Sequence, residues 1–315
     1  MKIYKVGGVV RDKILGIEPN DVDYVVVGST FEEMQDLGYI PIGRRFPIFL
    51  HPETKEEYAL ARKEIKIGRR HGDFEFVFTP EVTLQEDLGR RDLTCNAIAY
   101  DDETGEYIDY FNGIEDIQNK TLRCVHARHF VEDPLRVLRV CRFVAQLDFE
   151  VAQKTKRLCR RMVKRGEMSY LSPERICGEL FKALQCKNAS KFFVCMRDFG
   201  ALKILMPELD SLFDIKESEE IYQVKTIGER IMKALDIAAD EKPIIKFGIL
   251  MSAFDKLASS PDETEKKVNA FCNRLRMPES FKCLARNSAV YSKNFMNILN
   301  MPAQDLYEMN YKLIF

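Results

Sequence analysis

The spacing of apolar residues divides the chain into two parts. Up to about residue 125, short apolar runs typical of strands alternate with brief segments typical of helices. The segments between the runs are too short for repeated βαβ crossovers, so we expect a small mixed sheet with flanking helices. The expected strands are Ile3–Val6, Val22–Val27, Tyr58–Ala61, Phe74–Phe78, Tyr107–Tyr110 and Thr121–Val125.

Polar residues at the expected helix starts agree with this pattern. Thr30 with Glu33, and Thr83 with Glu86, have the spacing of capping boxes, which begin helices. From about residue 126 the apolar spacing is helical to the end, and Pro173 after a serine is typical of a helix start. The sequence therefore predicts an α+β chain in which a mixed head precedes an all-helical remainder.

Changes in pattern predict three regions. We expect a head over residues 1–125, a helical neck over 126–215, and a helical body and tail over 216–315. The acidic stretch 208–220 is the expected linker between the last two regions.

Composition limits the class of protein. The 315 residues are 46% hydrophobic and 31% charged, as in an ordinary soluble protein. No apolar run approaches the roughly 18–20 residues of a membrane span, and an apolar secretion signal is missing at the start. The nine cysteines form no C-x-x-C pair and fall mostly on apolar faces of expected helices. We therefore expect reduced thiols in a cytoplasmic protein, and no zinc site.

Charge is unevenly distributed, although the formal net charge is only −1. Residues 154–165 contain no acid and carry the basic residues Lys154, Lys156, Arg157, Arg160, Arg161, Lys164 and Arg165. A segment of this kind suggests a polyanion partner such as RNA, and a solvated helix face is the alternative. The expected RNA contacts are Lys154, Arg157, Arg160 and Arg161.

A glycine pair followed by two aspartates is the most informative stretch. Gly7 and Gly8 lie between an expected strand and an expected helix, where backbone N–H groups can hold phosphate. Asp21 and Asp23 are two residues apart at the start of the next strand, so their carboxylates would lie side by side. The glycine pair alone is common as a turn, and the aspartate pair alone is common in solvated loops. The glycine pair followed by the aspartate pair favours Mg²⁺-dependent nucleotidyl transfer.

Residues 89–98 form a second candidate stretch. Arg90 and Arg91 are suited to neutralising a triphosphate, because a guanidinium group binds phosphate oxygens in a fork. Asp92 and Asn96 are candidates for the ribose hydroxyls. On its own the stretch is equally consistent with a cluster of surface ion pairs.

Asp133 and Arg136 form a third candidate, since residues three apart at a helix start share a face. Cytosine and adenine both present an exocyclic amine beside a ring-nitrogen acceptor, which a carboxylate and a guanidinium complement. Uracil and guanine would leave both protein groups unpaired, at about 1–3 kcal/mol each. An ordinary helix salt bridge is the alternative.

These stretches together resemble class II CCA-adding enzymes, the tRNA nucleotidyltransferases, of the bacterial type over roughly residues 1–210. The matching stretches are Gly7–Asp12, Asp21 and Asp23, Gly43–Leu50, Tyr58–Glu64, Arg90–Ala97, Asp109–Ile117, Glu132–Phe143 and Leu171–Ile176. The resemblance implies a polymerase-β-like nucleotidyltransferase head, followed by a helical neck, body and tail.

The same resemblance implies template-independent addition of C, C and A to the 3′ end of tRNA from CTP and ATP, with release of pyrophosphate. The implied site residues are Gly8 and Arg11 for the triphosphate, Asp21 and Asp23 for two Mg²⁺ ions, Arg91 for the nucleotide, and Asp133, Arg136 and Arg139 on the base-reading helix. Residues 66–74 match the flexible loop with which the family switches from C to A.

One departure concerns a phosphohydrolase domain with which many bacterial relatives continue. The metal ligands of that domain are His and Asp, and the domain lies in the C-terminal part of those relatives. The four histidines here are His51, His71, His126 and His129, so no residue after 129 can supply a His ligand. We therefore expect no phosphohydrolase activity.

Three alternatives to the complete CCA-adding activity remain open from the sequence. The first is an enzyme of the same fold with partial specificity: CC-adding, A-adding or poly(A)-forming. The second is a nucleotide synthetase without an RNA substrate, and the third is an inactive RNA-binding module. The paired aspartates disfavour the third, and the long basic helical half disfavours the second.

Overall fold

The computed structural model describes residues 1–19, 21–42, 47–66, 74–218 and 223–296, which fall into two units. The first unit contains Met1–Arg136 and Phe149–Met162, and the second contains Val137–Asp148 and Val163–Phe315. Most of the loop expected at 66–74, and residues 43–46 of the matching stretch Gly43–Leu50, lie outside the described residues. The division at residues 125 and 215 stays a prediction.

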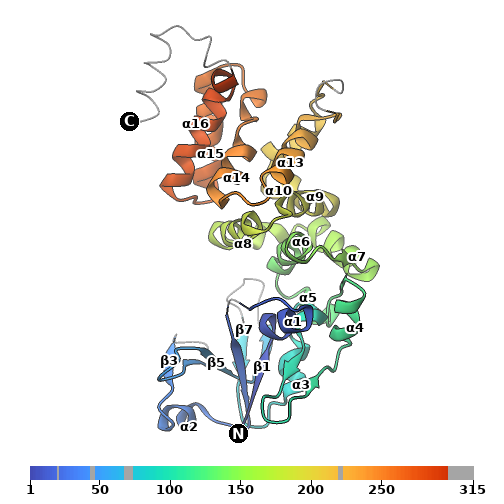
Figure 1. Cartoon of the computed structure of the whole chain (residues 1–315), viewed down its shortest axis with the longest axis vertical. Helices are drawn as coiled ribbons and strands as arrows, with labels where there is room; N and C mark the ends of the chain where they lie inside the picture. Colours follow the sequence, from blue (N-terminus) through green and yellow to red (C-terminus); the bar gives the residue numbers. More distant parts are fainter. Residues whose placement is uncertain (20, 43–46, 67–73, 219–222, 297–315) are drawn as a thin grey trace. The chain divides into compact units, whose positions relative to one another are not determined.

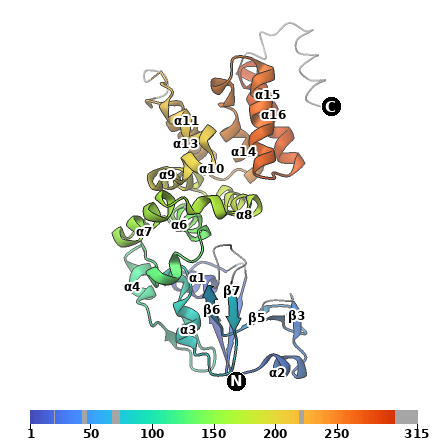
Figure 2. The ribbon, with the colours of Figure 1, turned by 180° about the vertical axis from the view of Figure 1, so that it is seen from behind.

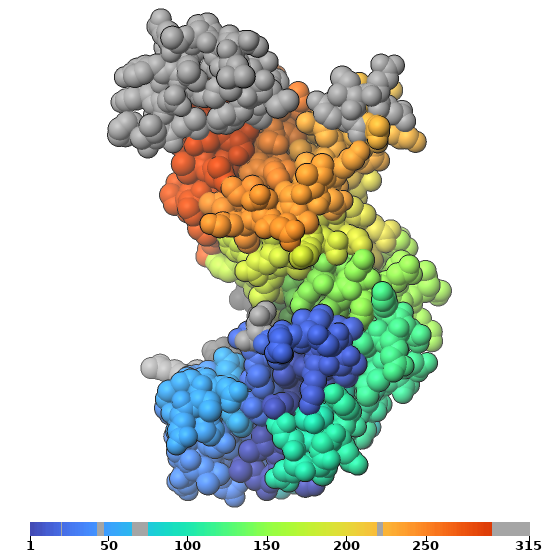
Figure 3. All heavy atoms as spheres, viewed as in Figure 1, coloured from blue at the N-terminus to red at the C-terminus, as the bar shows by residue number. Residues whose placement is uncertain are grey.

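A seven-stranded mixed sheet forms the centre of the first unit (Figure 1). Its order is β3-β4-β5-β2-β1-β8-β9, and the only parallel pair among these strands is β2 with β5. In Figure 3 the N-terminal segment (blue) accordingly lies between the light blue and teal segments. The strands are β1 Lys2–Val6, β2 Asp23–Val27, β3 Ile40–Ile42, β4 Ile48–Leu50, β5 Glu57–Leu60, β8 Ala99–Tyr100 and β9 Tyr107–Ile108.

Alternating side chains give the sheet two apolar faces. On one face, Tyr4, Val6 and Val25 pack with Leu84 and Leu88 of helix α3, Leu84–Gly89. The opposite face carries a second cluster, which includes residues from β2, β4 and β5 and from helix α2, Phe31–Asp36. Both helices begin with the expected capping boxes, since each threonine hydroxyl accepts from a glutamate N–H three residues on. Two buried faces explain why the sheet needs helices on both sides.

Smaller elements complete the first unit. Figure 2 shows the antiparallel hairpin of β6, Lys63–Lys66, and β7, Phe74–Val77. Strand β10, Thr121–Leu122, pairs in parallel with β11, Glu150–Val151, so a segment distant in sequence joins the unit. The helices are α1 Gly8–Leu15, the 3₁₀ turn η1 Thr94–Asn96, α4 Gly113–Gln118, α5 Ala127–Phe130 and α7 Gln153–Lys164, of which Val163 and Lys164 belong to the second unit.

The expected strands are present, but several bounds differ. The last two shorten to β9 and β10, because the paired registers involve only two residues each. The sequence pattern missed β3, β4, β6, β8 and β11, which are two to four residues long and too short for a period to be read. Strand β2 begins at Asp23, so Asp21 precedes it.

Helices make up most of the second unit. They are α6 Leu135–Leu147, which begins in the first unit, α8 Pro173–Gln185, α9 Ala189–Phe199, α10 Ala201–Leu205, α11 Pro207–Ser211, α13 Ile227–Ile237, α14 Pro243–Met251, α15 Pro261–Arg274 and α16 Glu279–Met296, with 3₁₀ turns η2 Glu167–Tyr170, η3 Leu212–Asp214 and η4 Phe254–Leu257. Helix α16 packs against α14 and α15 (Figures 1 and 2), and the ring of Phe271 contacts those of Phe247 and Phe254.

The expectation of an acidic linker over 208–220 is wrong for its first half. Leu209 and Leu212 are buried, so α11 and η3 pack as part of the helical core. Leu209 and Leu212 lie three residues apart and form an apolar helix face, but the acidic residues around them made the segment resemble a linker.

Lys246 in α14 is also buried, and its ammonium group donates to the backbone carbonyls of Cys186 and Ala239 at 2.8 and 2.7 Å. Burial lowers the pKa of Lys246 below its usual range.

Within the described residues, none of the helices combines the length and the apolar character needed to cross a membrane.

Candidate active site

The glycine turn after β1 has the geometry that the sequence predicts. Gly7 has φ +80°, a conformation that other residues rarely adopt, and α1 begins at Gly8. A Cβ atom on Gly7 would lie 3.0 Å from Nη1 of Arg91. Glycine is therefore required twice, by its backbone angle and by the approach of a guanidinium group.

Arg11, one turn into α1, is buried with 3% of its surface exposed. Its guanidinium donates to Asp12 Oδ1 at 2.8 Å and to Asn96 Oδ1 at 2.7 Å. Asn96 Nδ2 donates in turn to Asp92 Oδ1 at 3.2 Å, and Asp92 also accepts the Leu93 N–H. The structure thus joins the helix after the glycine turn to residues 89–98 through a buried polar chain.

Asp21 and Asp23 are both exposed, near the start of β2. Asp23 shares a sheet face with Val25, the face that α3 covers. Although Asp23 lies at the surface, partial desolvation by the surrounding protein raises its pKa. The charge of Arg91 opposes this rise, and the charge of Asp21 adds to it. The two carboxylates therefore lie near each other and near Arg91.

Asp87 in α3 binds the two arginines of the second candidate stretch. Arg90 donates to Asp87 Oδ1 through Nε and Nη2 at 3.1 and 2.7 Å, and Arg91 Nη2 donates to Oδ2 at 3.2 Å. Arg90 also donates to Glu64 Oε1 at 2.8 Å. Arg90 is therefore held in an ion-pair cluster, while Arg91 extends toward Gly7 and Asp23.

Asp133 and Arg136 lie at the start of α6. Asp133 Oδ1 accepts the Leu135 N–H at 3.0 Å, and so caps the helix at the start that the sequence predicts. The Arg136 guanidinium donates to the backbone carbonyls of His129 and Arg90, each at 2.7 Å. Arg139 lies one turn further on, in the second unit, with its guanidinium 5.5 Å from the ring centroid of Phe143.

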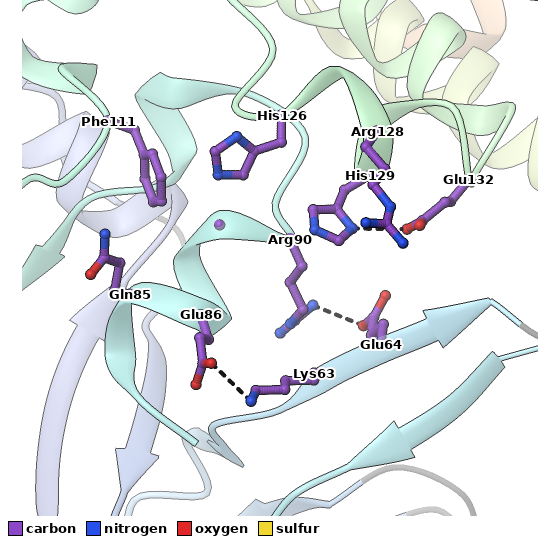
Figure 4. A pocket seen from close by; sticks show the side chains of 11 residues that line it. Lys63, Glu64, Gln85, Glu86, Arg90, Phe111, His126, Arg128, His129 and Glu132 are labelled. Atoms are coloured by element: carbon purple, nitrogen blue, oxygen red, sulfur yellow. Dashed lines mark hydrogen bonds and ion pairs between the residues drawn. The ribbon is translucent and has the colours of Figure 1, made fainter. Parts of the chain in front are cut away.

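A pocket of about 600 Å³ lies beside Arg90 in the first unit (Figure 4). Its charged groups are largely paired with one another, as Lys63 with Glu86 and Arg90 with Glu64, and His129 Nδ1 lies 3.2 Å from a Glu132 carboxylate oxygen. The close-up shows Arg90 extending toward Glu64 from the middle of the lining. The lining residues are Lys63, Glu64, Gln85, Glu86, Gly89, Arg90, Phe111, His126, Arg128, His129 and Glu132.

The basic segment folds as helix α7, with Leu158, Cys159 and Met162 buried along one side. Thr155, also buried, accepts the Cys124 N–H at 3.0 Å and ties the helix to the first unit. All four expected RNA contacts, Lys154, Arg157, Arg160 and Arg161, are exposed.

Several residues of this arrangement escaped sequence reasoning. Asp87 precedes Arg90 by three and Arg91 by four residues, and that helical spacing was the signal that could have found it. Asp116 is buried and accepts from Thr94 Oγ1 at 2.7 Å and from Arg123. No short-range spacing links Asp116 to Thr94, which is 22 residues away.

Within the described residues, no group of three or more His, Cys, Asp or Glu side chains is placed to hold a metal ion.

Known proteins match the chain over most of its length. Residues 3–123 match the poly A polymerase head domain, and residues 148–213 match the "probable RNA and SrmB-binding site of polymerase A". A multifunctional CCA protein of Nitrosomonas europaea is 44% identical over 297 residues, which cover 90% of this chain and 72% of that protein.

Solved structures agree with the sequence matches. A tRNA-processing enzyme in an apo form superimposes with a TM-score of 0.65 at 26% identity, over 95% of this chain and 79% of that one. A CCA-adding enzyme in an apo form gives 0.65 at 26% identity, over 98% and 70% of the two chains. The Thermotoga maritima CCA-adding enzyme complexed with tRNA shares the fold, with 0.65 at 24% identity over 99% and 70%. By its identity to the curated relative and its fold, the chain belongs to the family of CCA-adding tRNA nucleotidyltransferases.

Proposed function

We propose that this chain adds C, C and A to the 3′ end of tRNA, using CTP and ATP and releasing pyrophosphate, without a nucleic-acid template. The observation that carries the proposal is the grouping of Asp21, Asp23, Arg91 and the Gly7–Gly8 turn within one unit. Carboxylates beside a cationic, glycine-lined turn are what transfer of a nucleotidyl group requires.

Asp21 and Asp23 would hold two Mg²⁺ ions. Their exposed carboxylates fit the preference of this ion for oxygen ligands, and the mutual repulsion that contributes to the raised pKa of Asp23 is relieved by a cation. When bound, the ions lower the pKa of the tRNA 3′-hydroxyl and neutralise the departing pyrophosphate.

Three residues serve the triphosphate. Arg91 approaches Gly7 closely and acts on Asp23, which suits it to phosphate oxygens next to the metal-binding pair. Gly8 begins α1 and offers the N-terminal end of that helix. Arg11 is bonded to Asn96 and Asp12, so it supports the turn as well as adding positive charge. Asp92, bonded to Asn96, is the partner for the ribose.

Asp133 and Arg136 read the base. The two backbone carbonyls that accept from Arg136 fix the plane of its guanidinium, and the bond from the Leu135 N–H fixes the Asp133 carboxylate at the start of the same helix. A fixed acceptor and donor favour C and A and reject U and G, because the wrong base leaves protein groups unpaired. Arg139 completes the basic side of this helix.

Helix α7 grips the tRNA backbone through Lys154, Arg157, Arg160 and Arg161, whose exposure suits phosphate contacts. The head, neck, body and tail divide at about residues 125 and 215. A cytoplasmic location agrees with the cysteines, all of which are free. Burial raises the pKa of Cys95 and Cys272 to about 12, so these two thiols stay protonated and unreactive.

The test is incorporation of labelled CTP and ATP, separately and together, into tRNAs that end before the first C, after the second C and after the terminal A, with Mg²⁺. Addition of two C residues and one A, and no further growth, supports the proposal. A product that stops after the second C, or that grows into poly(A), contradicts the proposed specificity. No incorporation beside an active control enzyme contradicts the proposed reaction.

A further inference from the structure

One buried carboxylate binds arginines that face two different parts of the site. Asp87 is 1% exposed, and its Oδ1 accepts from Arg90 and from the Arg62 N–H at 3.2 Å. Its Oδ2 accepts from Arg91. Both carboxylate oxygens are therefore held, and the side chain has no freedom to rotate without breaking these bonds.

The two arginines have separate surroundings. Arg91 lies against the Gly7 turn and acts on the charge of Asp23. Arg90 is anchored by Asp87 and Glu64, and its backbone carbonyl accepts from Arg136. A displacement of Asp87 would therefore move Arg91, which faces the proposed phosphate site. It would also move the Arg90 backbone and with it Arg136, which faces the proposed base site.

We propose that Asp87 is a positioning residue that sets the triphosphate-binding arginine and the base-reading arginine relative to each other. The inference rests on the proposed roles of Arg91 and Arg136. Asp87 touches neither phosphate nor base, and acts only by holding Arg91 directly and Arg136 through the Arg90 carbonyl.

The charge of Asp87 is secured by its neighbours. Burial alone would raise the pKa of Asp87, but the charges of Arg90 and Arg91 outweigh it and lower the pKa to about 2. Asp87 therefore stays anionic at any pH at which the enzyme works, and a neutral replacement removes an interaction that both arginines share.

Asp116 provides a matched control on the other side of the same stretch. It is also a buried aspartate, with 3% of its surface exposed. Its partners are Thr94 Oγ1 and the guanidinium of Arg123, so it braces residues 89–98 without binding Arg90 or Arg91. Loss of either aspartate should lower stability, but only Asp87 should change how the nucleotide is bound and chosen.

The experiment compares Asp87→Asn, Asp87→Glu and Asp116→Asn with the wild type, by steady-state kinetics and melting temperature. Asparagine keeps the size of Asp87 but faces Arg91 with an N–H donor. We expect Asp87→Asn to raise KM for CTP and ATP about tenfold or more, and to reduce the preference for CTP over UTP by about the same factor. Asp87→Glu restores the charge and should recover part of both losses. Asp116→Asn should melt earlier and keep the wild-type preference.

Three outcomes would overturn the inference. The first is an unchanged preference for CTP over UTP in Asp87→Asn. The second is a loss of preference in Asp116→Asn equal to that in Asp87→Asn, because the effect would then be general loosening. If Asp87→Asn does not fold, the decision falls to Arg90→Lys, which keeps a charge but loses the fork onto Asp87. An unchanged preference in Arg90→Lys is the third. Failure of the wild type to add C and A would contradict the proposed function itself, and the incorporation assay on the wild type alone detects it.

Discussion

Arg136 donates a 2.7 Å hydrogen bond from Nη2 to the backbone carbonyl oxygen of Arg90, 46 residues earlier in the chain. The bond joins the start of α6 to the end of α3, the two places at which the sequence predicts nucleotide-binding residues. Because the acceptor is a backbone atom, the Arg90 side chain affects this bond only indirectly, by holding its own backbone in position.

Replacing Arg136 should weaken base choice. We expect Arg136→Ala to raise the incorporation of UTP and GTP relative to CTP and ATP by roughly tenfold or more, since the site then lacks one of its two fixed partners. Competition between labelled nucleotides measures the effect. Arg128→Ala, in the neighbouring helix α5, is the control and should keep the wild-type preference. An unchanged preference in Arg136→Ala would remove α6 from base reading.

Replacing either exposed aspartate should stop catalysis without releasing the RNA. Asp21→Ala and Asp23→Ala each remove a carboxylate expected to bind Mg²⁺, so incorporation should fall by several orders of magnitude. Binding of tRNA, measured by filter retention, should stay close to wild type. Asp36→Ala, an exposed aspartate at the end of α2 in the same unit, should stay active. Metal-independent turnover by either variant would contradict the assignment.

The basic face of α7 should make tRNA binding depend on salt. We expect Arg157→Ala and Arg161→Ala each to reduce the slope of log affinity against log salt by about one or less, because each removes one phosphate contact. Lys187→Ala is the control, since Lys187 is exposed but paired with Asp240. A slope equal to that of the wild type in both α7 variants would exclude this helix as the phosphate grip.

Acid should remove the stabilisation that Asp87 contributes. Its pKa of about 2 in the folded chain lies below the ordinary value of 3.8, so the contribution is complete above about pH 4 and is lost as pH falls toward 2. The difference in free energy of unfolding between wild type and Asp87→Asn should therefore shrink over that range. Urea titrations at pH 5, 4 and 3 measure it, and a difference that stays constant with pH would contradict the charged state of Asp87.

Two helical glycines should respond oppositely to alanine. A Cβ on Gly228 in α13 would lie 2.4 Å from the ring of Phe213, so Gly228→Ala should destabilise the chain by about 1–3 kcal/mol. Gly178 in α8 has nothing within 4 Å of that position, and Gly178→Ala should stabilise by about 0.5–1 kcal/mol. Melting temperatures distinguish the two. An unchanged or raised melting temperature in Gly228→Ala would show that packing at Phe213 is not limiting, and a lowered one in Gly178→Ala would contradict the second expectation.

Local signals in the sequence predicted much of the fold and part of the site. Both capping boxes of the head, the glycine turn and the helix after Asp133 follow from residues within a few positions of each other. The short strands β3, β4 and β8 exist because neighbouring strands pair with them, and no local period marks them. The partners of Arg136 and the bond between Asp116 and Thr94 depend on packing of distant segments, so spacing alone could not reveal them.

The discontinuity of the first unit has a consequence for how it is completed. Strand β10 pairs with β11, and the Cys124 N–H donates to Thr155. Both partners, β11 and Thr155, come later in the chain than residues 137–148, which belong to the second unit. On the ribosome, the catalytic unit therefore cannot finish folding as its own first 136 residues emerge. An exchange of catalytic units between relatives must likewise carry residues 149–162 along with the N-terminal segment, or leave that strand edge and N–H unpaired.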